Sequence, residues 1–164
     1  MLLLTACSGS KQEASQQKTQ TEEEEQVSVP ADNAPRVTIK QGVWGDVLFF
    51  SGDFSTSEND GKVEPVARKL YIYEPTKPAQ VSFVHRERGS FISKIQTKLV
   101  DSTASDDSGF YQLSLPPGRY SLFVNEDSAL YANHLSSKGY LADFEVYKDR
   151  VAYFRIIIAY DADY

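Results

Sequence analysis

The sequence predicts an all-β protein, a Greek-key sandwich of about seven strands behind a disordered N-terminal tether. Several short runs alternate apolar and polar residues between Gly, Pro, Asn and Asp turn signals, as half-buried strands do. No stretch keeps a helical apolar repeat over several turns. Residues 8–35 are polar and lack aromatic side chains, so they cannot bury enough apolar surface to offset their conformational entropy. We therefore expect one folded domain, residues 36–164.

The N-terminal segment predicts an attachment to a membrane. Leu4-Thr5-Ala6-Cys7 resembles the bacterial lipobox, in which a signal peptidase cleaves before the Cys and the thiol receives lipid. Residues 1–7 are interpreted as a signal-peptide remnant with this motif, and residues 8–35 as a flexible linker. Cys7 is the single cysteine of the chain, so an intrachain disulfide is excluded. A lipid on Cys7 would anchor the protein without a membrane-spanning segment.

The first half of the domain divides into strands and loops. Val37–Ser51 is the first predicted strand region, and Ser51–Lys62 is a polar loop with an Asn-Asp-Gly turn signal. Ala67–Glu74 is the second strand and stops at a proline. Gln80–Ser93 is expected to form a hairpin-like excursion with a charged tip. Ile95–Thr103 is expected to resume a strand.

The second half is predicted as two hairpins with a loop between them. Ser105–Val124 reads as one alternating strand on each side of a Pro-Pro-Gly turn, behind an Asp-Asp-Ser-Gly turn. Asn125–Gly139 is expected to be a loop with a short helical turn near Ala129–Leu135. Tyr140–Tyr147 and Val151–Tyr160 are expected to pair as the closing hairpin, and the second of these strands to be central because Arg155 is its only charge.

The pattern S-D-x-x-G-F-Y-x-L-x-L-P-P-G-x-Y-x-L-x-V in this hairpin resembles the carboxypeptidase regulatory-like domain, whose fold is a transthyretin-like (prealbumin-like) sandwich. Each residue of the match has a structural reason. Asp106 can accept backbone hydrogen bonds in the turn, and Gly109 can adopt a positive φ. Pro117 presets φ before Gly118. Tyr111 and Tyr120 can fill the core with their rings.

The resemblance implies a non-catalytic module in a Bacteroidetes-type lipoprotein, since the enzymes that carry such a domain keep their zinc site in a separate domain. We therefore expect no enzyme activity, no cofactor and no metal site. The two histidines, His85 and His134, show no zinc-ligand spacing, and no G-x-S-x-G motif occurs. Asp101, Asp106 and Asp107 do not have the spacing of an EF-hand calcium loop.

Charge and exposed rings bear on the partner. The net charge is −6 and no basic stripe is present, which argues against nucleic acid. The expected role is a lipid-anchored envelope module, on the periplasmic or outer face of the outer membrane, that contacts another protein or has a structural role. The alternative is glycan binding by exposed aromatic residues. The candidates for that platform are Trp44, Tyr71, Tyr73 and Tyr131.

Overall fold

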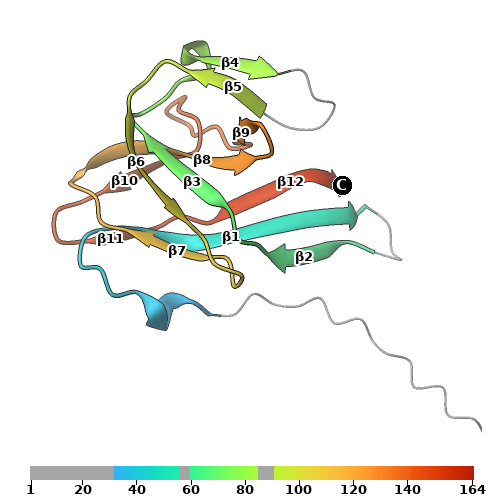
Figure 1. The fold of residues 1–164 in the computed structure, drawn as a ribbon, viewed down its shortest axis with the longest axis horizontal. Helices are drawn as coiled ribbons and strands as arrows, with labels where there is room; N and C mark the ends of the chain where they lie inside the picture. The colour runs from blue at the N-terminus through green and yellow to red at the C-terminus, as the bar shows by residue number, and fades with distance from the viewer. Residues whose placement is uncertain (1–31, 56–59, 85–90) are drawn as a thin grey trace, which may run out of the picture.

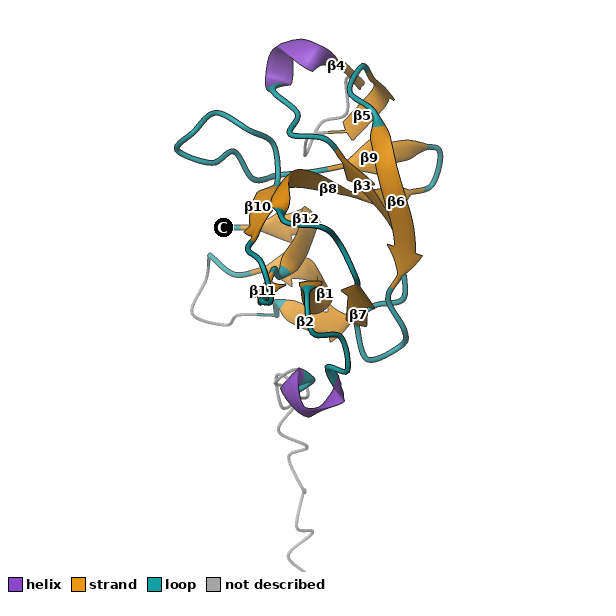
Figure 2. Cartoon of the chain, turned by 90° about the vertical axis from the view of Figure 1, so that its left-hand side faces the viewer, coloured by secondary structure: helices purple, strands orange, loops and turns teal. Residues whose placement is uncertain are grey.

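A computed structural model describes residues 32–55, 60–84 and 91–164. Within them the chain forms two β-sheets packed face to face, and the only helices are two short 3-10 turns (Figures 1 and 2). The predicted all-β sandwich is thereby confirmed. The elements are η1 (Ala34–Arg36), β1 (Gly42–Asp53), β2 (Lys62–Pro65), β3 (Lys69–Tyr73), η2 (Pro78–Gln80), β4 (Val81–Val84), β5 (Phe91–Ile95), β6 (Leu99–Ala104), β7 (Phe110–Leu113), β8 (Gly118–Glu126), β9 (Ala129–Tyr131), β10 (Asp143–Val146), β11 (Val151–Tyr153) and β12 (Ile156–Asp163).

The first sheet is built around β1. This strand pairs in parallel with β11 and β12 and antiparallel with β7 and β2. Gly45 allows the close approach of the neighbouring chain, because a Cβ there would lie 1.9 Å from the carbonyl oxygen of Phe154. The backbone N–H of Phe154 in turn donates to Trp44 across this junction, at 2.9 Å. β11 and β12 therefore follow β1 in one register as far as the pair Phe49 and Ile158, with a short break between the two strands, and the register shifts before Ser51.

The second sheet has the order β4-β5-β9-β8-β3-β6, with β10 also pairing to β8, and all its pairs are antiparallel. Its longest strand, β8, is buried over most of its length. Side chains alternate across a strand, so β8 presents apolar residues to both faces of the sheet. Leu122 and Val124 face the first sheet, and Phe123 faces away from it.

The main core lies between the sheets. It joins β1 and β12 of the first sheet to β3, β8, β9 and β10 of the second. A smaller cluster lies on the opposite face of the second sheet, where Phe123 and Ile92 pack with Leu141 of the segment after β9. The backbone N–H of Leu141 donates to the carbonyl of Thr76 at 2.8 Å, which holds that segment over the sheet.

The two predicted hairpins are wrong in their pairing. β7 and β8 flank the Pro-Pro-Gly turn, yet β7 pairs with β1 and β8 with strands of the other sheet. β10 and β11 likewise belong to different sheets. In both places the chain crosses from one sheet to the other, because each strand finds its partner among residues distant in sequence.

Three smaller expectations also change. Ala129–Tyr131 is a strand, β9, rather than a helical turn, because it pairs with both β5 and β8. The run predicted as one strand over Ile95–Thr103 is divided, with Ile95 ending β5 and β6 beginning at Leu99. Within the described residues β12 pairs with β1 alone, so β1, not the final strand, is central to its sheet. The expected excursion at Gln80–Ser93 does form a hairpin, β4 with β5, and its tip at 85–90 lies outside the described residues.

Candidate functional site

The Asp-Asp-Ser-Gly turn leads the chain from β6 into β7. The Oδ1 of Asp106 accepts hydrogen bonds from the backbone N–H groups of Ser108 and Phe110, at 3.0 and 3.2 Å. Gly109 has φ +75°, and a Cβ there would lie 2.6 Å from the carbonyl oxygen of Val47. The carbonyl of Gly109 accepts from the N–H of Val47 at 2.9 Å, which locks the turn to the central strand. These are the turn roles that the sequence predicts for Asp106 and Gly109.

The Pro-Pro-Gly segment carries the chain between the two sheets. The hydroxyl of Tyr120 donates to the carbonyl of Pro116 at 2.9 Å, which closes the corner, and burial raises the pKa of Tyr120. Pro117 is exposed at the bend. Gly118 has no positive φ, and a Cβ on it would come within 3.2 Å of the Tyr120 hydroxyl. The segment therefore serves as an inter-sheet corner.

Tyr111 is completely buried between the sheets, and its hydroxyl donates to the carbonyl of Phe154. Burial raises the pKa of this tyrosine well above its usual value, and the nearby carboxylate of Asp46 adds to the effect. The Tyr111 hydroxyl thus provides a hydrogen-bond partner, from inside the core, for a backbone carbonyl in the break between β11 and β12.

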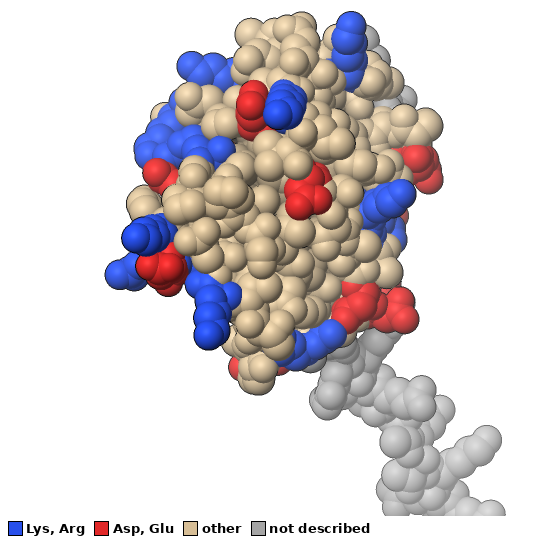
Figure 3. Space-filling model, turned by 60° about the vertical axis from the view of Figure 1, so that its left-hand side comes forward, with Lys and Arg blue, Asp and Glu red and all other residues tan. Residues whose placement is uncertain are grey.

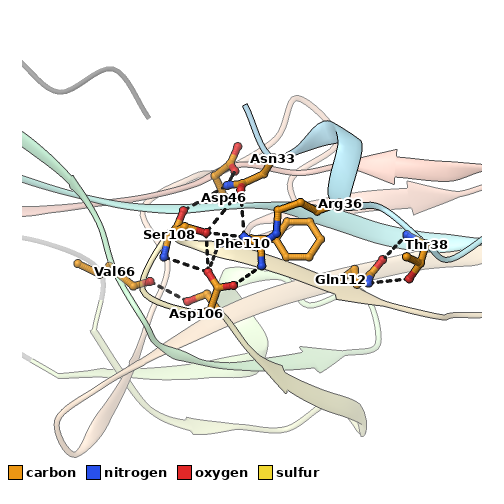
Figure 4. A network of polar contacts seen from close by, with 10 residues as sticks. Asn33, Arg36, Thr38, Asp46, Val66, Asp106, Ser108, Phe110 and Gln112 are labelled. Atoms are coloured by element: carbon orange, nitrogen blue, oxygen red, sulfur yellow. Dashed lines mark hydrogen bonds and ion pairs between the residues drawn. The ribbon is translucent and has the colours of Figure 1, made fainter. Parts of the chain in front are cut away.

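The segment before β1 is fastened to the outside of the first sheet, in a network we call the N-terminal clamp, made of Asn33, Arg36, Asp46, Asp106 and Ser108 (Figure 4). The Nδ2 of Asn33 donates to the Oδ1 of Asp46 at 2.7 Å and to the carbonyl of Ser108 at 3.2 Å. Asn33 is 3% exposed, so the folded domain includes it.

Arg36 supplies the positive charge of the N-terminal clamp. Its guanidinium pairs with Asp106, bonds to the side chain of Asn33 at 3.1 Å and lies over the ring of Phe110, 4.3 Å from the ring centroid. The hydrogen bond from Arg36 is the main reason that the pKa of Asp106 falls to about 2. Further along the same segment, the Gln112 side chain accepts from the backbone N–H of Thr38 at 3.0 Å. Sequence reasoning missed this clamp, since Asp106 and Ser108 lie 70 or more residues from Arg36 and Asn33 in the chain.

The four predicted platform residues do not share a surface. Trp44 is partly buried on the outer face of the first sheet, where its ring lies 4.7 Å from that of Tyr153. Tyr71 and Tyr73 lie in β3 of the second sheet, and Tyr73 packs edge-on against Phe123. Tyr131 is 1% exposed in the main core. The structure therefore brings none of the other three beside Trp44.

An open groove runs along the outer edge of β12, and we call it the β12 groove. Its volume is about 430 Å³. β12 and the residue before it form one wall, with Arg155, Ile157 and Ala159, and Asn133 and His134 face them from the segment after β9. Phe154 and Tyr164 complete the lining. Next to it, a smaller, partly open space of about 30 Å³ reaches between the sheets and shares Asn133, His134, Arg155 and Ile157 with the groove.

The charge of the β12 groove is carried by Arg155. Its guanidinium lies 3.6 Å from the Oδ2 of Asp46 and sits near the ring of Tyr153, and its side chain is 48% exposed. Ile157 is exposed beside it, whereas its neighbours Ile156 and Ile158 are buried. The groove thus combines an apolar strand edge with a cation. Asn133 and His134 lie after β9, within the range Asn125–Gly139 that the sequence predicts as a loop.

The remaining candidate chemistry is placed as follows. Cys7 and His85 lie outside the described residues. Within residues 32–55, 60–84 and 91–164, no group of three or more His, Cys, Asp or Glu side chains is placed to hold a metal ion. The two helices of the same part of the chain have three residues each, so neither could span a bilayer.

One face of the molecule is shown in Figure 3. On it, Lys and Arg side chains lie singly or in small groups, mostly toward the margin, with Asp and Glu interspersed among them. The middle of this face is largely uncharged. It therefore carries no continuous basic surface of the kind that the phosphate backbone of nucleic acid requires.

Comparison with known proteins gives no identification: no family model, no curated protein and no solved structure matches this chain.

Proposed function

We propose that this chain is a lipid-anchored, non-catalytic module of the cell envelope that contacts another envelope protein or has a structural role. Two features of the sequence support the proposal. Cys7 stands in a lipobox-like motif, and the polar residues that follow it can act as a tether. The resemblance of Ser105–Val124 to a carboxypeptidase regulatory-like domain supports an accessory rather than a catalytic role.

The N-terminal clamp is the observation that carries the proposal. A domain held at a distance from a membrane needs a firm attachment between its tether and its core. Asn33 is buried, and Arg36 bridges the tether end to Asp106 and Phe110. Asn33 also donates a hydrogen bond to Asp46 of the central strand, so a force on the tether is transmitted directly to β1.

The anchor is tested by replacing the attachment residue. We expect the native chain in the outer-membrane fraction of its host and the Cys7→Ala variant in the soluble fraction, because the variant has no thiol to acylate. Ser8→Ala is the matched control, since it changes the neighbouring residue and keeps the thiol. Incorporation of labelled fatty acid into the native chain but not into Cys7→Ala is the second readout. Unchanged fractionation of Cys7→Ala would refute the anchor.

A further inference from the structure

We propose that the β12 groove binds an extended peptide segment of a partner protein, which adds as a strand to the edge of β12 and bears an acidic side chain opposite Arg155. This inference rests on the proposed function as an interaction module and names its binding surface. In strand addition, main-chain hydrogen bonds provide affinity and alternate side chains provide specificity. The required features are open backbone groups, a place for side chains and room for one chain.

Backbone groups of β12 face the groove. The N–H of Phe154 points to β1, since it donates to Trp44, and the N–H of Ala159 points away, since it donates to the Tyr131 hydroxyl at 3.3 Å. Successive residues of a strand point their N–H and C=O groups to opposite sides. The N–H and C=O groups of Arg155 and Ile157 therefore point away from β1. This orientation agrees with both Phe154 and Ala159.

The residues that line the β12 groove limit the size of the chain that can bind there. Asn133 and His134 line the groove together with β12, and its volume of about 430 Å³ suits a few residues of one extended chain rather than the edge of a folded domain. A peptide side chain turned inward meets the space of about 30 Å³ next to the groove, which accepts a small apolar group. A side chain turned outward lies beside Arg155 and Ile157.

Charge selects the outward side chain. Arg155 has five N–H donors, and its contact with Asp46 is a long one at 3.6 Å. Its half-exposed guanidinium can accordingly donate hydrogen bonds to a peptide carboxylate while it keeps its contact with Asp46. The peptide chemistry that fits is thus an alternation of small apolar and acidic residues.

The test measures fluorescence polarisation with the full chain carrying Cys7→Ser, which removes the lipid. The probe is a short fluorescein-labelled peptide that alternates valine and aspartate. One comparison peptide carries lysine in place of aspartate, and another carries proline at its central valine. We expect the acidic peptide to bind, the lysine peptide to bind about tenfold more weakly, and the proline peptide not to bind, because proline cannot donate to the strand.

Variants locate the binding. Ile157→Lys should abolish it, and Arg155→Gln should erase the preference for aspartate over lysine. Val100→Lys is the matched control, because Val100 is also exposed on a strand at the edge of a sheet, β6, and should leave binding unchanged. Circular dichroism checks that each variant is folded.

Three outcomes would overturn the inference: no binding by any peptide, equal binding of all three, or a dimer in solution that Ile157→Lys dissociates, since a second copy would then occupy the edge. None of them affects the fractionation of Cys7→Ala, so failure of the groove and failure of the anchor are distinguishable.

Discussion

Gly109→Ala tests whether the turn between β6 and β7 is held by close backbone contact. Gly109 has φ +75°, and an L-residue in the left-handed region costs about 1–2 kcal/mol. An added Cβ would lie 2.6 Å from the carbonyl oxygen of Val47 and 3.2 Å from its nitrogen, so the backbone has to move. That movement breaks the hydrogen bond from Val47 to Gly109.

Val47 is fully buried, and its unpaired N–H would cost about 1–3 kcal/mol. The expected loss of stability for Gly109→Ala is therefore about 3 kcal/mol. Gly139→Ala is the matched control. Gly139 has φ +79°, but an added Cβ would meet nothing within 4 Å, so Gly139→Ala carries only the conformational cost. The difference between the two variants, about 2 kcal/mol, isolates the contact because the effects of Gly→Ala on the unfolded chain cancel.

The assay is urea unfolding followed by circular dichroism on the full chain carrying Cys7→Ser. With a slope of about 1–3 kcal/mol per molar urea, the midpoint of Gly109→Ala should fall about 1 M below that of Gly139→Ala. Equal midpoints for the two variants would refute the reasoning, since the backbone contact would then contribute nothing beyond the conformational cost.

Two further predictions concern polar contacts. Asp106 has a folded-state pKa of about 2, below its unfolded value of about 4, so its contribution is present above pH 4 and lost as the pH falls toward 2. Asp106 is nearly half exposed, so solvent screening reduces that contribution to about 1 kcal/mol or less. Arg36→Ala should lower the free energy of unfolding by this amount at pH 7, and its difference from the native chain in urea unfolding should narrow between pH 4 and pH 2. A difference that does not change with pH would contradict the assignment. Tyr111→Phe should lower the free energy of unfolding by about 1–3 kcal/mol, because the partly buried carbonyl of Phe154 loses its hydroxyl partner. A change within about 0.5 kcal/mol in thermal or urea unfolding would show that this carbonyl has another partner.

The fold class could be predicted from the sequence because it depends on local pattern. Alternating runs such as Tyr120–Val124 place every second side chain in the core, and the structure buries these residues. The turn at Asp106–Gly109 was equally predictable, since a carboxylate that caps nearby amides and a residue with positive φ act within a few positions of each other.

Pairing could not be predicted in the same way. Every backbone offers the same N–H and C=O groups, so alternation identifies a buried face without identifying a neighbour. For this reason the alternation predicts a hairpin across the Pro-Pro-Gly turn, although the two strands join different sheets. Val151–Tyr160 has Arg155 as its only charge and is therefore predicted to be central, yet it borders the β12 groove.

The sequence by itself determined that the chain is an all-β domain behind a polar segment, and it set the conformation of the Asp106–Gly109 turn. Only the tertiary structure decided which strands pair, that Tyr131 is buried rather than exposed, and that Asn33 and Arg36 fasten the start of the domain. It alone placed Arg155 and Ile157 opposite His134. The physical reason is that local conformation follows from neighbouring residues, whereas a groove or a clamp requires side chains from distant segments to meet, which happens only when the two sheets pack.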